Sequence, residues 1–262
     1  MKAIITGATG FIGRNIAESL VNDGVKVIGA GRSTQVGDEL NTQGIEFRPA
    51  DIRNQAFISS LSPADCLIHC AGKTGDWGDP REFHQVNVQG TRNVIAACMK
   101  HGIGKIIFIS TPSLYYNGKN RLGISESDPL PERHLTAYAR TKLAAENDLA
   151  DFGRKGFKVI TFRPRAVFGP HDNTFLPRIL MMANKKQFPL IGGGRALVDI
   201  TCVENLIDAV RCAIDAPDTA WNEVYNISNG DPITIKEWFS RMLSFFGLEM
   251  IPKNIPLPMA KA

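Results

Sequence analysis

Tyr138 and Lys142 are the two side chains in this sequence best suited to move a proton. They stand four residues apart, so on a helix they lie on one face and their heads can converge on one ligand. A tyrosine phenol has an unperturbed pKa of about 10, and a nearby ammonium lowers that pKa because it stabilises the phenolate. Such a pair can give a proton to a carbonyl or take one from an alcohol. The same spacing also fits a solvated lysine beside a half-buried tyrosine.

A glycine-rich segment near the N-terminus could hold a phosphate-bearing ligand. It runs Gly7-Ala8-Thr9-Gly10-Phe11-Ile12-Gly13, follows a short apolar run typical of a buried strand, and opens onto a helical pattern of apolar residues. Glycines there let the backbone approach a pyrophosphate, which binds the free N–H groups at the helix N-terminus. The spacing is G-x-x-G-x-x-G rather than the commoner G-x-G-x-x-G dinucleotide fingerprint. The alternative is a tight turn without a ligand.

Thr111 stands where these two segments would meet. It follows a predicted strand over residues 104–110, and ligands of open α/β sheets bind outside the carboxyl ends of the strands. Its hydroxyl is therefore a candidate for the same site. The alternative is a strand-end hydroxyl that caps a backbone group.

An alternating pattern of strands and helices must position these residues. The chain has 262 residues, of which 44% are hydrophobic, enough to bury one large core. We expect an α/β fold with a doubly wound parallel sheet of the Rossmann type, covered by helices on both faces. The predicted strands lie near 2–6, 25–30, 45–49, 65–70, 104–110 and 157–162.

A smaller unit is expected beyond this sheet. Residues 175–186 and 235–246 carry helical patterns that would cap the cleft, whereas 199–213 returns to the main unit. The prediction is a dinucleotide-binding domain, residues 1–164 and 199–215, with a small C-terminal substrate-capping subdomain, residues 165–198 and 216–262.

Seven motifs follow one another in a characteristic order. They are the glycine turn at Gly7, Gly10 and Gly13; Ala50-Asp51-Ile52; His69-Cys70-Ala71-Gly72; Val86-Asn87-Val88-Gln89-Gly90-Thr91; Ile109-Ser110-Thr111-Pro112-Ser113-Leu114-Tyr115; the Tyr138/Lys142 pair; and Phe162-Arg163-Pro164-Arg165-Ala166-Val167-Phe168-Gly169-Pro170. With them the sequence resembles the extended branch of the short-chain dehydrogenase/reductase superfamily, the NAD-dependent epimerase/dehydratase family with its 3β-hydroxysteroid-dehydrogenase-like group. The resemblance covers nearly the whole chain and implies a nicotinamide-dependent oxidoreductase. The resembling group continues with helical sequence past the last residues here, so truncation at the C-terminus is one interpretation.

The resemblance implies catalytic roles for three residues. Thr111 occupies the position of the Ser or Thr that hydrogen-bonds the reacting oxygen. Tyr138 occupies that of the general acid/base. Lys142 would hold the nicotinamide ribose and lower the pKa of Tyr138. Helices including the one with Tyr138 would form a homodimer interface.

The resemblance also implies a set of cofactor contacts. They are assigned to the glycine turn, with Thr9, Phe11 and Ile12, and to Tyr138 and Lys142. Asp51 would accept from the adenine amino group, and Ile52 would cover the adenine ring. Ala71 and Gly72 would line the cleft, Pro164 would lie near the nicotinamide, and Asn87 has a structural role that could outweigh any contact.

The end of the second predicted strand bears on which cofactor is bound. An acidic residue there binds the ribose 2′-hydroxyl of NAD and repels a 2′-phosphate. Gly31 stands where the resembling NAD enzymes carry Asp, and Arg32 follows with a guanidinium suited to a phosphate dianion. We therefore expect NADP(H) to be preferred, with NAD(H) as the alternative in which Arg32 stacks on adenine without discriminating.

The substrate is expected to be a small molecule, and the motifs say less about its class than about the cofactor. Nucleotide-sugar enzymes of the resembling family place an Asn where this chain has Ala166, which favours a hydrophobic hydroxy or oxo compound, sterol-like, 3-oxoacyl-like or aromatic. A nucleotide-sugar epimerase or 4-reductase is the alternative, and a non-catalytic NADP-binding sensor is the third interpretation. The candidate substrate contacts are Lys73, Trp77, Pro112, Ser113, Ala166 and His171. Apolar side chains near the predicted cleft could shelter such a substrate or belong to the core; they are Trp77, Leu114, Tyr115, Phe168, Phe175 and Leu176.

Composition excludes several other classes. The first strand begins directly after Met1, and no run of about 18 apolar residues is present, so neither a signal peptide nor a membrane span is expected. Five cysteines in mostly apolar contexts indicate a reducing, cytoplasmic compartment, and Cys66 and Cys70 lack metal-ligand spacing, so no metal is expected. A net charge of +4 is too small to indicate nucleic-acid binding.

Overall fold

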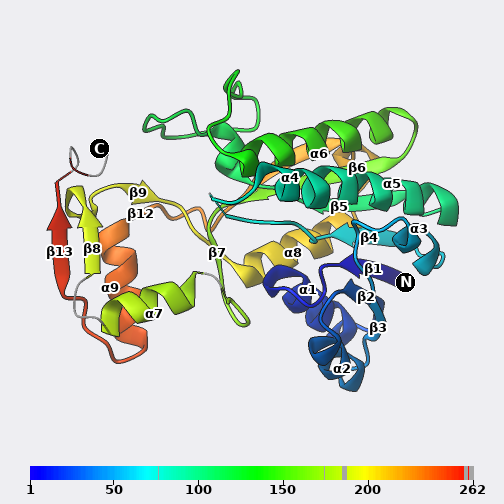
Figure 1. Ribbon diagram of the computed structural model, residues 1–262, viewed down its shortest axis with the longest axis horizontal. Helices are drawn as coiled ribbons and strands as arrows, with labels where there is room; N and C mark the ends of the chain where they lie inside the picture. The colour runs from blue at the N-terminus through cyan, green and yellow to red at the C-terminus, as the bar shows by residue number, and fades with distance from the viewer. Residues whose placement is uncertain (76, 174, 185–187, 257–258, 260–262) are drawn as a thin grey trace.

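A seven-stranded, all-parallel sheet forms the larger part of the molecule (Figure 1). The structure is a computed structural model that describes residues 1–75, 77–173, 175–184, 188–256 and 259. Across the sheet the strands run β11 (Glu223–Ile227), β6 (Lys158–Pro164), β5 (Lys105–Ile109), β4 (Cys66–His69), β1 (Lys2–Thr6), β2 (Lys26–Gly31) and β3 (Glu46–Pro49). The inner strands are continuous apolar runs because helices cover them on both faces.

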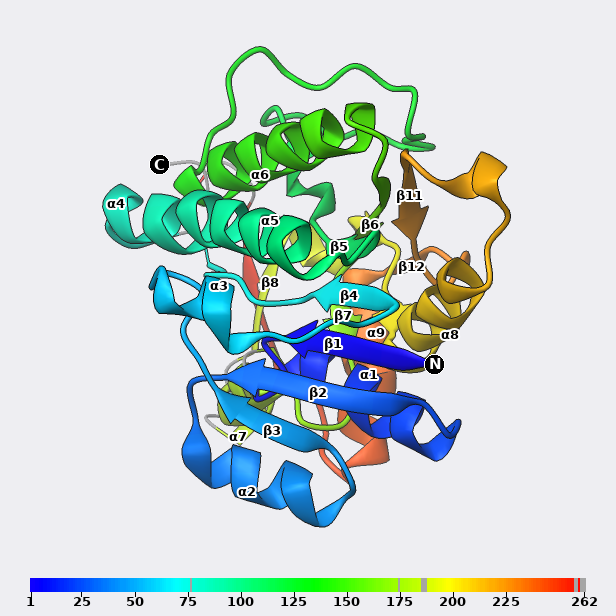
Figure 2. The ribbon, with the colours of Figure 1, turned by 90° about the vertical axis from the view of Figure 1, so that its right-hand side faces the viewer.

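Two layers of helices enclose the sheet, as Figure 2 shows. On one face lie α1 (Phe11–Asn22), α2 (Thr34–Thr42) and α8 (Val203–Ile214); on the other lie α3 (Ala56–Ser60), α5 (Gly90–His101) and α6 (Ala137–Arg154). Each layer has its own apolar core against the sheet. The expected doubly wound α/β fold is therefore confirmed, with strands at all six predicted places.

The seventh strand of the sheet, β11, lies in a segment that was expected to belong to the capping subdomain. Residues 216–262 were assigned to the capping subdomain, yet β11 pairs in parallel with β6, with Glu223 opposite Ile160. Helix α8 supplies the crossover that a parallel neighbour requires. As an edge strand β11 is only half-buried, so it lacks the continuous apolar run that marks the inner strands. The rest of the proposed domain division stays a prediction.

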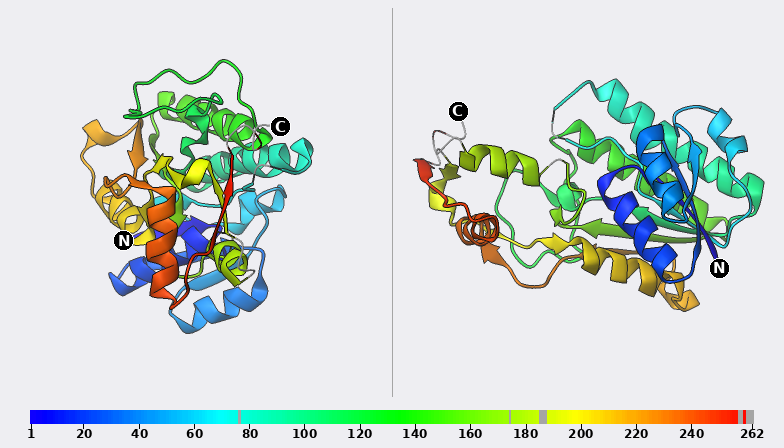
Figure 3. Two further views of the ribbon diagram at one scale, coloured as in Figure 1. Left: turned by 90° about the vertical axis from the view of Figure 1, so that its left-hand side faces the viewer. Right: turned by 90° about the horizontal axis from the view of Figure 1, so that it is seen from below.

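A small cap stands beyond the carboxyl ends of the strands (Figure 3). It contains α7 (Leu176–Asn184), β8 (Phe188–Ile191), α9 (Ile235–Phe245) and β13 (Pro252–Ile255), with β8 and β13 paired in parallel. Its core gathers Ile179, Phe188, Trp238 and Leu243. The two helices match the expected patterns at 175–186 and 235–246, although residues 185–186 lie outside the described part of the chain.

Short strand pairs connect the cap with the sheet. They are β7 (Val167–Phe168) with β10 (Thr201–Cys202), and β9 (Leu197–Val198) with β12 (Ile233–Thr234). Among the described residues, none of the helices is both long enough and apolar enough to cross a membrane.

Candidate active site and cofactor pocket

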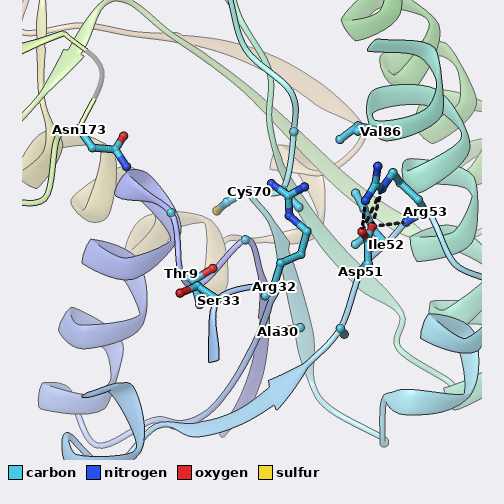
Figure 4. A pocket seen from close by; sticks show the side chains of 16 residues that line it. Thr9, Ala30, Arg32, Ser33, Asp51, Ile52, Arg53, Cys70, Val86 and Asn173 are labelled. Atoms are coloured by element: carbon cyan, nitrogen blue, oxygen red, sulfur yellow. Dashed lines mark hydrogen bonds and ion pairs between the residues drawn. The ribbon is translucent and has the colours of Figure 1, made fainter. Parts of the chain in front are cut away.

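A cavity of about 570 Å³ opens at the carboxyl ends of the central strands (Figure 4). That size is in the range of small-molecule sites. It brings together eight of the predicted cofactor residues, Gly7, Thr9, Gly10, Arg32, Asp51, Ile52, Ala71 and Gly72. The other lining residues are Ala30, Gly31, Ser33, Ala50, Arg53, Cys70, Val86 and Asn173.

The glycine turn is shaped by close backbone packing. Gly7 has a positive φ of 73°, and a Cβ on it would lie 2.7 Å from the backbone nitrogen of Ala71. A Cβ on Gly13 would overlap the carbonyl group of Gly7. Helix α1 begins immediately after Gly10, whose position carries no side-chain cap. The first N–H groups of α1 are therefore available to an anionic ligand at the cavity.

Phe11, Ile12 and Pro164 are not among the described residues that line the cavity. Phe11 and Ile12 lie in the first turn of α1 and pack against the core beneath the sheet. Pro164 is buried as the last residue of β6, opposite Ile227 of β11.

Charged groups concentrate at one end of the cavity. The Asp51 carboxylate accepts hydrogen bonds from the Arg53 guanidinium, with Nε at 2.9 Å from Oδ2, and from the Arg53 backbone N–H at 2.9 Å. The Arg53 side chain is the main reason that the pKa of Asp51 lies below its usual value. Arg32 extends from the end of β2 into the cavity and has no hydrogen-bond partner among the described residues (Figure 4). Sequence reasoning missed Arg53, although a cation two residues after Asp51 was the available signal.

Lys142 is bonded to the end of β5, two residues before Thr111. The Lys142 Nζ is buried, donates to the backbone carbonyl of Ile109 at 2.7 Å, and lies 3.9 Å from the centroid of the Phe108 ring. Desolvation lowers the pKa of Lys142 to about 7. The Thr111 hydroxyl donates to Ser113 Oγ at 3.1 Å and accepts from the Ser113 backbone N–H at 3.2 Å.

Tyr138 stands in the first turn of α6, one turn before Lys142. The helix begins here because the Thr136 hydroxyl accepts from the Ala139 N–H at 3.1 Å, which is an N-cap. The Tyr138 ring lies 6.4 Å from the Phe83 ring, centroid to centroid. The capped start of α6 thus sets where Tyr138 stands in the helix, one turn ahead of Lys142.

A buried ionic network lies behind Lys142. Glu146 follows it by one helical turn and accepts from the Arg163 guanidinium, with Nη2 at 2.6 Å from Oε2. Arg163 also donates from Nη1 to the Tyr115 hydroxyl at 2.6 Å, and Ser110 Oγ donates to Glu146. Glu146 partly offsets the desolvation of Lys142, because its charge raises the pKa of that ammonium. The one sequence signal for this network was the i, i+4 spacing of Lys142 and Glu146.

A second buried network centres on His69. Its Nδ1 lies 2.7 Å from Thr6 Oγ1, and its Nε2 lies 3.0 Å from Thr91 Oγ1. The Thr91 hydroxyl already donates to the Asn87 carbonyl at 2.7 Å, so it accepts from His69, which carries its proton on Nε2. Burial lowers the pKa of His69 to about 3, and the ring is neutral.

Asn87 lies beneath the cavity wall rather than in it. Its Oδ1 accepts from the Lys73 backbone N–H at 2.7 Å, and its Nδ2 donates to the Lys73 carbonyl at 3.0 Å and to Thr141 Oγ1 at 3.1 Å. The amide thereby holds the segment after β4 against α6.

The predicted substrate residues do not form one cluster. Pro112 and Ser113 lie beside Thr111 in a short 3₁₀ helix, and Ala166 is exposed. The Lys73 ammonium pairs with Glu82 at 2.8 Å, and the Trp77 side chain is 92% exposed.

His171 lies in the segment 169–173, which joins the sheet to the cap. Its Nε2 lies 3.1 Å from Glu18 Oε2 on α1. In the same segment, the Pro170 carbonyl accepts from Asn15 Nδ2 of α1 at 2.8 Å. Asn173 lines the cofactor cavity. The linker is thus attached to the helix that begins at the glycine turn.

The apolar side chains proposed to shelter a substrate divide into two groups. Leu114 and Tyr115 are fully buried in the core. Phe168 and Leu176 instead line a separate, mostly apolar cavity of about 660 Å³ together with Trp238. Phe175 stacks on Trp238 with a centroid distance of 5.0 Å.

Comparison with known proteins gives consistent matches. The model of the NAD dependent epimerase/dehydratase family matches residues 3–228. A 2-alkyl-3-oxoalkanoate reductase of Stenotrophomonas maltophilia is 33% identical over 97% of this chain and 78% of its own length. A 4-hydroxy-2-methyl-3-oxo-4-farnesyl-3,4-dihydroquinoline-1-oxide ketoreductase of Stigmatella aurantiaca is 29% identical over 100% of this chain and 78% of its own.

Among solved structures, the UDP-glucuronic acid 4-epimerase of Bacillus cereus, in complex with NAD, matches with a TM-score of 0.84. It is 26% identical, and the match covers 98% of this chain and 86% of that one. The ordered motifs, the cavity at the glycine turn and these matches agree. The chain belongs to the NAD-dependent epimerase/dehydratase family, in the extended branch of the short-chain dehydrogenases/reductases.

Proposed function

We propose that this protein is an NADP(H)-dependent oxidoreductase that interconverts a hydroxyl and an oxo group on a hydrophobic small molecule. The observation that carries the proposal is the position of Lys142, which follows Tyr138 by one helical turn and whose buried Nζ donates to Ile109 at the end of β5, two residues before Thr111. A bound nicotinamide supplies or accepts the hydride. Tyr138 gives the proton to the forming alcohol oxygen or takes it back, while Thr111 donates a hydrogen bond to that oxygen and Lys142 stabilises the phenolate.

The cavity fits a nicotinamide dinucleotide. The glycine turn leaves the N-terminus of α1 open to a diphosphate. Gly7 has a positive φ, and a Cβ on Gly13 would overlap the carbonyl group of Gly7, so the shape of the turn depends on glycine at both positions. The charged residues that line the cavity are Arg32, Arg53 and Asp51, so two cations face one carboxylate. Arg53 is already paired with Asp51, and Arg32 is the guanidinium left to bind a 2′-phosphate. This arrangement supports NADP(H) over NAD(H).

The hydrophobic substrate class rests on the relatives and on Ala166. Both ketoreductases reported above act, by name, on oxo groups of largely apolar molecules. The second candidate is a nucleotide-sugar epimerase or 4-reductase, which the similarity to the UDP-glucuronic acid 4-epimerase favours. The third, a cofactor-bound sensor, is opposed by the presence of Thr111, Tyr138 and Lys142. Cytoplasmic location and a homodimer stay predictions from the sequence.

The test is oxidation of NADPH and reduction of NADP+ with long-chain 3-oxo acids, steroids, aromatic aldehydes and nucleotide sugars, with Tyr138→Phe as control. Turnover of an apolar carbonyl compound that disappears in Tyr138→Phe is the expected result. Turnover of nucleotide sugars alone, with cofactor retained through purification, would support the epimerase. Cofactor binding without turnover of any compound in the panel would support the sensor.

A further inference from the structure

Thr9 and Gly31 are in steric contact at the end of β2. Gly31 is buried as the last residue of that strand, and the Thr9 side chain comes to it from the glycine turn. A Cβ placed on Gly31 would lie 2.6 Å from Thr9 Oγ1 and 2.8 Å from Thr9 Cγ2. Side-chain carbons do not approach other heavy atoms so closely, so Thr9 would have to move before position 31 could carry any side chain.

The restriction on Gly31 concerns space and not backbone conformation. Its φ lies outside the positive range that favours glycine, so another residue could adopt this backbone. The closest obstructing atoms all belong to one side chain, that of Thr9, which is β-branched and restricted at χ1, and whose Cβ lies at 3.2 Å. Removal of that side chain beyond Cβ would therefore relieve most of the conflict.

We propose that Thr9 is a specificity-determining residue for the cofactor, because its branched side chain fills the space that an acid at position 31 would need. Without that acid, no carboxylate at the end of β2 accepts the ribose 2′-hydroxyl or repels a 2′-phosphate. The ribose end of the cavity is left to Arg32, which is exposed and unpaired among the described residues. This inference rests on the proposed NADP(H) function, and it adds that Thr9 and Gly31 act as a pair.

If Thr9 and Gly31 act as a pair, an acid at position 31 alone should not change the cofactor preference from NADPH to NADH. In Gly31→Asp, the carboxylate is displaced by Thr9, so NADPH affinity falls by about tenfold or more while NADH affinity does not rise. In Thr9→Ala/Gly31→Asp, the two nearest atoms are gone and the carboxylate can reach the ribose. NADH affinity should then exceed that of Gly31→Asp by about tenfold, the value of one charge-assisted hydrogen bond.

Thr9→Val/Gly31→Asp is the matched control. Valine keeps both branches at Cβ and replaces the threonine hydroxyl with a methyl group, so this double variant should bind NADH as weakly as Gly31→Asp. The experiment measures the dissociation constants of NADPH and NADH for wild type, Gly31→Asp and both double variants by calorimetry. Equal NADH affinity in Gly31→Asp and Thr9→Ala/Gly31→Asp would overturn the role of Thr9.

Stability gives an independent measurement should Gly31→Asp fail to fold. Gly31→Ala should lower the unfolding midpoint, and Thr9→Ala should restore most of that loss in the double variant, because the two sites are in contact. Strictly additive changes would contradict the steric pair. Equal affinity of the wild type for NADPH and NADH would instead reject the NADP(H) proposal, and this outcome is separate from the coupling between positions 9 and 31.

Discussion

Lys142 donates a hydrogen bond from Nζ to the backbone carbonyl oxygen of Ile109 at 2.7 Å, which ties helix α6 to the last residue of β5. The bond fixes a side chain that follows Tyr138 by one turn of the helix, at a strand end two residues before Thr111. Because the ammonium is buried, its position does not depend on solvent-exposed contacts. The helix that carries Tyr138 and the end of β5 are therefore held together by one buried amine.

The first prediction concerns Tyr138. Tyr138→Phe should lower kcat by about 10²- to 10⁴-fold, the usual contribution of a general acid/base, because the phenol acts mainly in the transition state. NADPH affinity should change by less than about twofold, since the ring remains in place. Steady-state kinetics and calorimetry measure the two effects. Tyr116→Phe, at a tyrosine that is 56% exposed, is the matched control and should leave both unchanged.

The second prediction concerns pH and Lys142. The pKa of Lys142 is lowered from 10.5 to about 7 in the folded protein, mainly by desolvation. Between these values the unfolded chain binds a proton that the folded chain does not, so folding is favoured as pH rises. The stability of the wild type relative to Lys142→Met should increase from about pH 7 to about pH 10.5. Urea unfolding of the cofactor-free proteins measures it, and a pH-independent difference would contradict this account.

The third prediction concerns the buried imidazole of His69. Its pKa falls from 6.5 to about 3 because of burial, so the unfolded chain takes up a proton first as the pH is lowered. Relative to His69→Gln, the wild type should lose stability progressively from about pH 6.5 to pH 3. Urea unfolding of both proteins across this pH range measures the difference, and a pH-independent difference would contradict the account.

The fourth prediction concerns the ion pair of Glu146 with Arg163. Arg163→Met leaves the Glu146 carboxylate buried without its partner and should cost about 3–5 kcal/mol of unfolding free energy. Replacing both residues with apolar side chains should recover much of that loss. Arg211→Met breaks exposed pairs with Asp23 and Asp208 and should cost much less. Equal losses for Arg163→Met and Arg211→Met in urea unfolding would show that burial does not control the effect.

The sequence predicted the main sheet well because its inner strands are buried on both faces and appear as continuous apolar runs. It missed β11 as a member of that sheet, since this half-buried edge strand has no such run. The glycine turn and the spacing of Tyr138 and Lys142 were local signals, so their elements were found. The network joining Glu146 to Arg163 is formed between different elements, and only folding brings the two together.

Side-chain direction was the other limit on prediction. Trp77 and His171 were expected to contact the substrate. The motifs around these residues do not specify where their side chains point. The Trp77 ring is 92% exposed, whereas His171 points to Glu18 on α1. A loop residue's environment depends on which element the loop crosses, and that is a property of the assembled fold.

The linker at residues 169–173 has a mechanical consequence. It carries the chain from the sheet into the cap, yet its Pro170 carbonyl is bonded to Asn15 and Asn173 lines the cofactor cavity. If this linker made no contact with α1, the cap could move relative to the sheet without disturbing the glycine turn. Here the linker is hydrogen-bonded to α1, so any movement of the cap relative to the sheet must either break that bond or move the helix that begins at the glycine turn.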